Sequence, residues 1–417
     1  MAANTGLVIV GAGQAGAKAA QTLREEGFDG PIVLFGEENQ HPYERPPLSK
    51  GYLLGKEERE TVYVHPPQWY IKHDIDLRLG ATVTAIDPAG HEVTLADGSR
   101  IGYAKLLLTT GSSPRRLPVP GADLEGVHYL RRLADSDRIK EAFRSASRIA
   151  VIGAGWIGLE TAAAARAAGV EVTVLETAEL PLLRVLGREV SQIFAALHTD
   201  HGVDLRCGVQ VAEITGDAGR ASGVLLGDGS RIGADAVIVG VGVTPNTQLA
   251  TAAGLDVGNG IRVDADLRTS HPDIYAAGDV ADAFHPLLGR HIRVEHWANA
   301  LNQPQVAAKA MLGRGVMYDR IPYFFTDQYD LGMEYTGYVE PGGYDQVVFR
   351  GRTDTREFIA FWLAEGRVLA GMNVNVWDVT DPLRALVTSG EPVDPTRLAD
   401  PDVPLSGLLG RPDSTGR

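Results

Sequence analysis

The stretch GLVIVGAGQAGAKAAQTLREEG, residues 6–27, decides the fold of this 417-residue chain. It joins a short apolar strand to an alanine-rich helical pattern through a GxGxxG motif, whose glycines are Gly11, Gly13 and Gly16. A second strand, PIVLF, follows over residues 31–35, and Glu37 stands 21 residues after Gly16. The glycines let backbone amides approach a pyrophosphate, the helix N-terminus faces its charge, and the acid binds ribose hydroxyls. The stretch therefore predicts a dinucleotide-binding unit.

The same device recurs in the middle of the chain. A strand over residues 149–152 runs into a second motif, GAGWIG, whose glycines are Gly153, Gly155 and Gly158. An alanine-rich helical pattern follows, and the strand VEVTVL ends at Glu176, 18 residues after Gly158. One copy could be a relic that only holds a helix against a sheet. Both acids, however, stand at strand ends, which favours two dinucleotides bound in two separate doubly wound units.

Composition limits the possible classes of function. The length predicts two or three domains, and 44% hydrophobic with 22% charged residues is typical of a folded protein. The net charge of −14 argues against nucleic acid or an anionic membrane as a general partner. Neither a targeting segment nor a long apolar run is present, so we expect a cytoplasmic protein. A single cysteine, Cys207, excludes an internal disulfide and a CxxC pair, and no metal-ligand cluster is expected.

A third segment, RTSHPDIYAAGDVADAF over residues 268–284, places Gly278 and Asp279 at the C-terminal end of an apolar strand. Ligands of such sheets bind at these strand ends. The pattern resembles the second FAD signature of the two-dinucleotide-binding flavoprotein reductases, in which the aspartate contacts the ribityl chain. TTGSSPR (109–115) and GVGVTPN (240–246) resemble the two crossover segments of that superfamily. They bracket the second glycine loop, so the resemblance implies an FAD domain interrupted by a nicotinamide domain.

The expected fold is α/β, with two Rossmann-like dinucleotide-binding domains and a C-terminal α+β domain. Short strands followed by a helix begin near Tyr323 and form the third domain. The expected bounds are 1–114 and 247–322 for the two parts of the FAD domain, 115–246 for the NAD domain and 323–417 for the C-terminal domain.

The lack of a cysteine near the flavin distinguishes this chain from several branches of the superfamily. Disulfide reductases and their peroxidase-like relatives need cysteines near the flavin, whereas Cys207 lies in the inserted domain. The segments RPPLSKGYL, EHWANALNQ and FFTDQYDLG together resemble the NADH-dependent ferredoxin reductases of the putidaredoxin reductase type, over nearly the whole chain. The resemblance implies FAD and NADH as cofactors. It also implies a [2Fe–2S] ferredoxin that serves a cytochrome P450 or a ring-hydroxylating dioxygenase.

The resemblance also points to Lys50 and Glu160 as catalytic residues. Glu160 follows Gly158 by two residues, in the first turn of a helix that faces the nicotinamide. A carboxylate there is costly unless it is paired, and Lys50, on a proline-stiffened loop of the FAD domain, is the expected partner. In the resembling reductases this pair sits beside flavin N5, where the lysine favours negative charge on the flavin. An ordinary inter-domain ion pair is the alternative interpretation.

Further FAD contacts are carried over from matching family segments: Ala15, Val83, Arg131 and Trp297. Trp297 begins a helical pattern whose amides would face the flavin, although a core aromatic side chain is the alternative. Pro304 within that pattern should kink the helix or delay its regular part. Arg131 could equally be a solvated charge. Because Arg132 is adjacent, either arginine could be the one that matches the family position.

Two rival functions remain at this point. One is an NADH dehydrogenase of the apoptosis-inducing-factor kind, which reduces quinone or oxygen. A membrane-bound quinone reductase usually has an apolar or amphipathic C-terminal anchor, and residues 402–417 are too short and polar for one. The other is a non-catalytic, redox-sensing binding protein. Two complete cofactor loops together with the Lys50–Glu160 pair argue against it.

Overall fold

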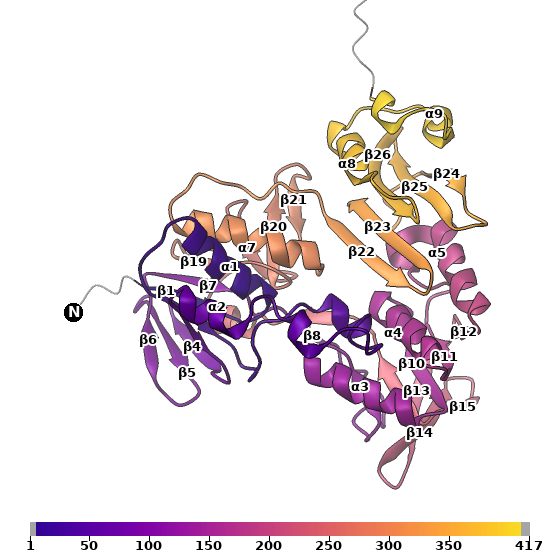
Figure 1. Ribbon diagram of the computed structural model, residues 1–417, viewed down its shortest axis with the longest axis horizontal. Helices are drawn as coiled ribbons and strands as arrows, with labels where there is room; N and C mark the ends of the chain where they lie inside the picture. Colours follow the sequence, from indigo (N-terminus) through magenta and orange to yellow (C-terminus); the bar gives the residue numbers. More distant parts are fainter. Residues whose placement is uncertain (1–5, 410–417) are drawn as a thin grey trace, which may run out of the picture. The chain divides into compact units, whose positions relative to one another are not determined.

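The computed structural model describes residues 6–409, so part of the polar C-terminal tail lies outside the described residues. The chain forms two compact units (Figure 1). Unit 1 extends to Pro47 and also contains Glu57–Ser113 and Val243–Arg320. Unit 2 contains Leu48–Lys56, Pro114–Gly242 and the residues from Ile321 onward. Each unit is built from segments distant in sequence, as expected for one nucleotide-binding domain inserted into another.

Unit 1 is built around a five-stranded parallel sheet in the order β19-β7-β1-β2-β3. Its strands are β1 (Leu7–Val10), β2 (Ile32–Phe35), β3 (Ile75–Arg78), β7 (Lys105–Leu108) and β19 (Ile274–Ala276). The central strands β1 and β7 consist of Val, Ile and Leu, apart from Lys105 at the start of β7, because both faces of a parallel sheet are covered. Helix α1 (Gln14–Glu25) packs against α7 (Trp297–Met311).

Helix α7 begins at Trp297 and continues through Pro304, so the proline does not delay its start.

Smaller elements complete unit 1. One antiparallel sheet contains β4 (Val83–Asp87), β5 (Glu92–Leu95) and β6 (Arg100–Gly102). Another sheet contains β18 (Ile261–Val263), β20 (Ala281–His285) and β21 (Arg290–Ile292). The remaining elements are η1 (Pro46–Ser49), which continues into unit 2, η2 (Arg59–Val62), α2 (Pro67–Lys72), α6 (Gln248–Ala252) and the paired crossover strands β8 (Ser112–Pro114) and β17 (Val243–Pro245). A turn follows Gly278 and leads into β20, not into a helix.

Unit 2 repeats the parallel arrangement, in the order β12-β11-β10-β16-β9. The strands are β9 (Val127–Tyr129), β10 (Arg148–Ile152), β11 (Glu171–Leu175), β12 (Asp204–Arg206) and β16 (Ala236–Val239). The helices of this part are α3 (Leu133–Ser145), α4 (Trp156–Ala167) and α5 (Leu183–Asp200). A small antiparallel sheet adds β13 (Val211–Asp217), β14 (Arg220–Leu226) and β15 (Arg231–Gly233).

The C-terminal part of unit 2 is an antiparallel sheet in the order β22-β23-β26-β25-β24, followed by short helices. Its strands are β22 (Tyr323–Gln328), β23 (Leu331–Gly337), β24 (Gln346–Arg352), β25 (Glu357–Ala364) and β26 (Arg367–Val374). The helical elements are α8 (Thr380–Ser389), α9 (Pro395–Ala399) and η3 (Leu405–Gly407). Strands followed by a helix match the sequence prediction, and together with the two parallel sheets they confirm the predicted α/β architecture.

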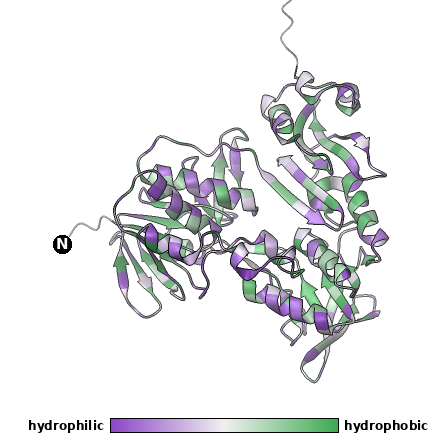
Figure 2. Ribbon diagram, in the orientation of Figure 1, coloured by the Kyte–Doolittle hydropathy of each residue, from purple (hydrophilic) through white to green (hydrophobic). Residues whose placement is uncertain are grey.

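The C-terminal sheet shares a hydrophobic core with the second glycine-loop domain. Trp156 of α4 packs against Phe324 of β22, with ring centroids 5.1 Å apart. The indole of Trp362, which is 1% exposed, donates a hydrogen bond to the Leu186 carbonyl at 3.0 Å. Apolar residues are concentrated in the central strands of both sheets (Figure 2). The two domains of unit 2 are therefore one packed body, because neither covers these aromatic side chains alone.

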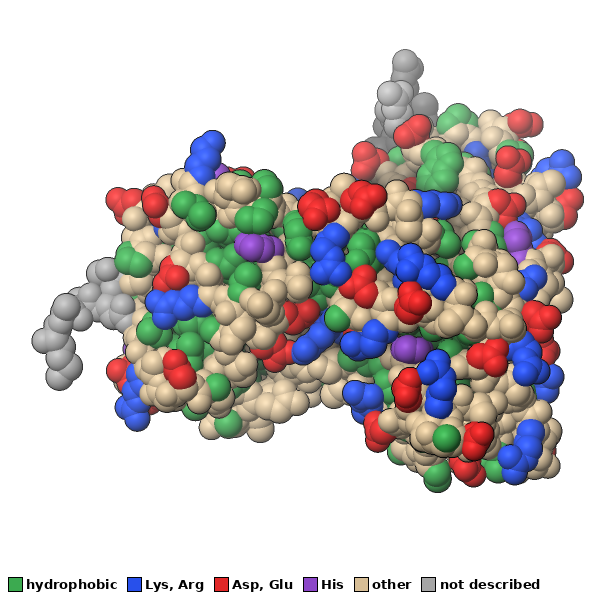
Figure 3. Space-filling model, turned by 60° about the horizontal axis from the view of Figure 1, so that its bottom comes forward, with side chains coloured by type: hydrophobic (Ala, Val, Ile, Leu, Met, Phe, Trp, Pro, Cys, Tyr) green, Lys and Arg blue, Asp and Glu red, His purple; other side chains and the backbone are tan. Residues whose placement is uncertain are grey.

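The surface shows no dominant charge pattern on the face in Figure 3, where acidic and basic side chains are intermixed. Among residues 6–409, no helix combines the length and the apolar character needed to cross a bilayer. The described residues also contain no cluster of three or more His, Cys, Asp and Glu side chains able to hold a metal ion.

The buried His198 of α5 generates a pH prediction. Burial lowers its pKa to about 4, below an ordinary value of 6.5. The folded chain thus binds fewer protons than the unfolded one, and stability is lost as the pH falls from about 6.5 to about 4. His198→Leu should remove up to about 3 kcal/mol of this pH dependence. Thermal unfolding followed by circular dichroism at several pH values measures it, and parallel wild-type and variant profiles would contradict the prediction.

Candidate functional site

Each glycine loop is closed on one side by backbone and open on the other. In unit 1, a Cβ on Gly16 would lie 2.1 Å from the Gly11 carbonyl oxygen. In unit 2, a Cβ on Gly158 would lie 2.0 Å from the Gly153 oxygen. The middle glycines, Gly13 and Gly155, have nothing within 4 Å of that position. Both loops therefore pack tightly against their own sheet and leave an open side where a ligand backbone can approach, which fits a pyrophosphate.

The loop of unit 1 lies beside the strand-end segment predicted to bind FAD. A Cβ on Gly278 would lie 3.2 Å from Cβ of Ala15. The Gly278 amide donates to Oε1 of Gln303 at 2.9 Å, and Oδ2 of Asp279 accepts a hydrogen bond from Ser112 at 3.0 Å. The structure thus brings the first glycine loop and the Gly278–Asp279 pair together, although residue 278 lies far from residue 15 in sequence.

A buried donor in the same loop supports the fit to FAD. Nε2 of Gln14, the first residue of α1, is buried and has no hydrogen-bond partner within the part of the chain that is described. An unpaired buried amide is costly, and a phosphate oxygen at the helix N-terminus would satisfy it. Glu37 follows β2 and is exposed, as a ribose-binding acid at a strand end should be. The residues of unit 1 fit a flavin dinucleotide.

The acid of the second loop, Glu176, is held in place before any coenzyme binds. Its Oε2 accepts the Ala154 amide at 2.7 Å, and its Oε1 accepts the Ala178 amide at 2.8 Å and the Thr177 hydroxyl at 3.1 Å. The Ala154 amide belongs to the glycine loop itself. The carboxylate therefore has a fixed position beside the second glycine loop, where the nucleotide is predicted to bind.

Lys50 and Glu160 form the predicted ion pair. Nζ of Lys50 lies 2.8 Å from Oε1 of Glu160, whose side chain is only 4% exposed. The carboxylate accepts two further hydrogen bonds at 2.5 Å, from the Ser49 hydroxyl to Oε2 and from the Thr326 hydroxyl to Oε1. Lys50 also lies 5.6 Å from the centroid of the Phe325 ring. A buried carboxylate with three donors is compensated, which removes the desolvation objection raised by the sequence.

The segment that carries Lys50 corrects one expectation. From the sequence we expect it in the FAD domain, whereas Leu48–Lys56 packs with unit 2, together with Glu160. The Leu48 carbonyl accepts the Ser136 hydroxyl of α3 at 2.8 Å, and the Tyr52 hydroxyl donates to Asp137 at 2.5 Å. Leu53 is 1% exposed and belongs to the core of unit 2. The lysine is thus held by α3, because the apolar side chains of its loop are buried there.

Sequence reasoning missed the other groups around Glu160. Ser49 directly precedes Lys50, and Thr326 and Asp327 lie in the FFTDQYDLG segment, so the signals were present without an assigned role. Burial raises the pKa of Asp327, with Lys50 opposing the shift and Glu160 adding to it. The site therefore contains a second carboxyl group near the ion pair.

The remaining predicted contacts are divided between the units. Val83 lies at the start of β4, and its side chain is 7% exposed in the core of unit 1. Trp297 is the first residue of α7, as predicted, and is partly exposed. Arg131 belongs to unit 2, where its amide donates to Asp135 at 3.0 Å and its side chain is half-buried, unlike a fully solvated charge.

Cys207 is unsuited to redox chemistry. Burial, together with the nearby Glu176 carboxylate, raises the pKa of its thiol to about 11. The thiolate is the reactive form, so a raised pKa disfavours reaction of this cysteine at neutral pH.

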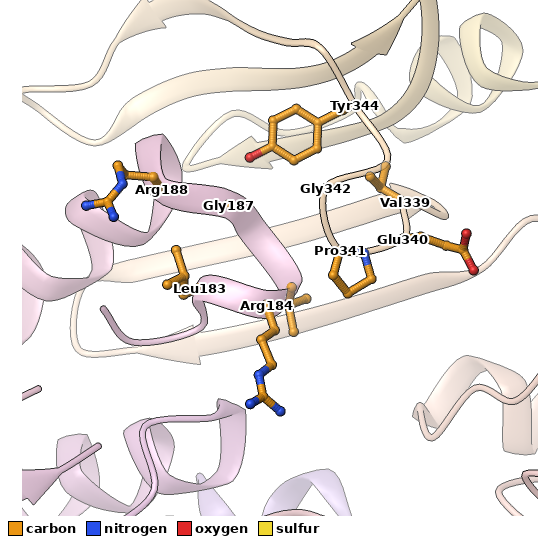
Figure 4. A pocket seen from close by; sticks show the side chains of 10 residues that line it. Leu183, Arg184, Gly187, Arg188, Val339, Glu340, Pro341, Gly342 and Tyr344 are labelled. Atoms are coloured by element: carbon orange, nitrogen blue, oxygen red, sulfur yellow. The ribbon is translucent and has the colours of Figure 1, made fainter. Parts of the chain in front are cut away.

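A pocket of about 250 Å³ opens between the start of α5 and the loop 339–344 (Figure 4). Arg184, Arg188 and Glu340 lie along its rim, and Tyr344 closes one side. None of the predicted site residues lines it. The residues that line this pocket are not among the partners of Glu160 described above.

Comparison with known proteins agrees with this geometry. Residues 5–304 match the family described as pyridine nucleotide-disulphide oxidoreductase, and residues 323–409 match the reductase C-terminal family. Rhodocoxin reductase of Rhodococcus erythropolis is 41% identical over 98% of this chain and 95% of its own length. The anthranilate 1,2-dioxygenase system ferredoxin–NAD(+) reductase component of Burkholderia cepacia is 41% identical over 96% and 98%. The reductase in the covalent putidaredoxin reductase–putidaredoxin complex superimposes with a TM-score of 0.94, at 39% identity over 98% of both chains.

The fixed Glu176 carboxylate generates a prediction on coenzyme choice. A 2′-phosphate would meet it at close range, so NADH should exceed NADPH in kcat/KM by at least about tenfold. Glu176→Gln should reduce this ratio because it removes the charge but keeps an acceptor. Arg184, eight residues later, could weaken the preference, so Arg184→Ala is the matched comparison. Steady-state kinetics with both coenzymes measures the ratio, and equal wild-type values would show the assignment of Glu176 to be wrong.

Proposed function

The chain belongs to the pyridine nucleotide-disulphide oxidoreductase family, and from this premise we propose that Lys50 and Glu160 act in hydride transfer. It is a flavoprotein of the ferredoxin–NAD(+) reductase type, with FAD and NADH as cofactors. The observation that carries the proposal is the buried, fully compensated ion pair directly after the second glycine loop.

Bound FAD would supply the hydride acceptor for NADH and would allow the electrons to leave one at a time. The Lys50 ammonium supplies a positive charge in a water-poor setting, where it stabilises negative charge that develops during the transfer. Glu160 holds that ammonium at one position, and Ser49 and Thr326 hold Glu160. The pair needs no nucleophile or metal, because the cofactors supply the reacting atoms.

The binding roles follow from position along the two motifs. We assign FAD to the first loop, Gly11, Gly13, Ala15 and Gly16, with further contacts from Glu37, Lys50, Val83, Arg131, Gly278, Asp279 and Trp297. We assign NADH to Gly153, Gly155, Gly158 and Glu176. We propose residues 1–114 and 247–322 as the FAD domain, 115–246 as the NADH domain and 323–417 as the C-terminal reductase domain, although the 48–56 segment packs with unit 2.

We propose a [2Fe–2S] ferredoxin as the acceptor, serving a cytochrome P450 or a ring-hydroxylating dioxygenase. The named relatives support it, since one is the reductase of an anthranilate dioxygenase system and another forms a complex with putidaredoxin. A cytoplasmic location fits the supply of NADH. Steady-state turnover with added ferredoxin, quinone or oxygen tests the acceptor. Faster turnover with quinone or oxygen than with every ferredoxin tried would favour a dehydrogenase of the apoptosis-inducing-factor kind.

Lys50→Met should slow flavin reduction by NADH about 100-fold or more, with little effect on FAD content, because it removes the positive charge and leaves Glu160 without its counter-ion. Lys56→Met is the matched control, since Lys56 is an exposed lysine of the same segment. Glu160→Gln should be milder, and the double variant should be less impaired than the product of the single effects. Stopped-flow absorbance of the flavin measures the rate. A wild-type rate in Lys50→Met would show that the lysine has only a structural role.

A further inference from the structure

A continuous chain of hydrogen bonds extends from Glu160 into the interior of unit 2. Oγ1 of Thr326, 2.5 Å from Glu160, lies 3.3 Å from Nε2 of Gln328. Oε1 of Gln328 lies 2.8 Å from Nε2 of His198 on α5, and Nδ1 of His198 lies 3.4 Å from the Tyr329 hydroxyl. Thr326 and Gln328 thus connect the ion pair to His198, on a different helix from the one that carries Glu160, and Tyr329 continues the chain beyond it.

The donors of this chain all point towards the carboxylate. Because Nε2 of His198 faces a carbonyl oxygen, the imidazole must donate there, which leaves Nδ1 to accept from Tyr329. Gln328 then donates through its amide to Thr326, and Thr326 donates to Glu160. Burial lowers the pKa of His198, so the ring is neutral at neutral pH, as this tautomer requires. Bonds aligned in one direction polarise one another and favour an ionised acceptor at the end.

The chain is buried and reaches solvent only at its far end. His198, Gln328 and Thr326 are each at most 1% exposed. Tyr329 stacks on His201, with ring centroids 3.8 Å apart. His201 is 32% exposed and lies 3.7 Å from Asp330, while Arg166 is the further charge that acts on Tyr329. No water is needed to connect the members, since every link is direct.

We propose that His198 and Gln328 are positioning residues for flavin reduction, which act through Thr326 to hold Glu160 as an oriented anion against Lys50. The proposal rests on the role assigned above to Lys50 and Glu160. A buried polar chain is a poor way to stabilise a core, because apolar side chains of equal volume do so without desolvation. The presence of this polar chain is explained by the Glu160 carboxylate at its end, because the donors to that carboxylate must be held in position.

Replacement of His198 tests the chain kinetically. His198→Leu removes the donor to Gln328 and should slow flavin reduction by NADH about tenfold. His198→Gln places an amide donor near the position of Nε2 and should restore most of the rate. Ser191→Ala is the matched control, because Ser191 is a buried residue of the same helix whose hydroxyl has no partner among the described residues. Gln328→Leu repeats the test if His198→Leu does not fold.

A second readout does not depend on turnover. In protein labelled with ¹⁵N-histidine, His198 should be neutral with its proton on Nε2, and its signal is identified by its loss in His198→Leu. Glu160→Gln should shift this signal, because it changes the acceptor at the end of the chain, whereas Ser191→Ala should not. An unshifted His198 signal in Glu160→Gln, or a proton on Nδ1, overturns the proposal.

The outcomes separate this inference from the role of the ion pair. A slow Lys50→Met with a fast His198→Leu overturns the chain and keeps the ion pair. Wild-type rates in both variants overturn the role of the ion pair and the chain with it. A slow His198→Leu that His198→Gln does not rescue also overturns the chain, because the effect then reflects packing. A slow His198→Leu, rescued by glutamine and without further effect in the Glu160→Gln background, supports it.

Discussion

The burial of one carboxylate organises much of unit 2. Glu160 stands where the second glycine loop becomes a helix, and a charge there is tolerated only if its oxygens are fully paired. Its three donors come from separate parts of the chain, Ser49 and Lys50 from one segment and Thr326 from the first strand of the C-terminal sheet. The C-terminal sheet and the 48–56 segment therefore meet at a single charged group, in addition to the apolar core that they share with the second glycine-loop domain.

Much of this arrangement could be predicted, because it depends on local chemistry. The glycine loops and strand-end acids follow from spacing, whereas the pairing of Lys50 with Glu160 is implied by the family resemblance together with the cost of an unpaired charge. The position of Lys50 in unit 2 did not follow, since it depends on which core covers Leu48 and Leu53. The roles of Ser49 and Thr326 could not be predicted for the same reason. A hydroxyl gains its role only from a partner that is distant in sequence.

The chain has a single cysteine and therefore no internal disulfide that could carry electrons. Its single thiol, Cys207, is kept protonated by burial and by the carboxylate of Glu176. The groups around Glu160 are instead hydroxyls, an amide, an imidazole and an ammonium, none of which takes up electrons. The protein part of the site is thus built for electrostatics and position, and electron flow is left to the cofactors and the acceptor.

The shared core of unit 2 limits how such reductases can diversify. The C-terminal sheet contributes Phe324 to the aromatic contact with Trp156, and Trp362 is tied to the backbone of Leu186. An exchange of this sheet between relatives, as a way to recombine partners, would break these contacts along the whole junction. Recombination of modules should therefore be rare here. The edge strand β22 is itself part of this junction through Phe324, so only substitutions elsewhere on the sheet leave these contacts intact.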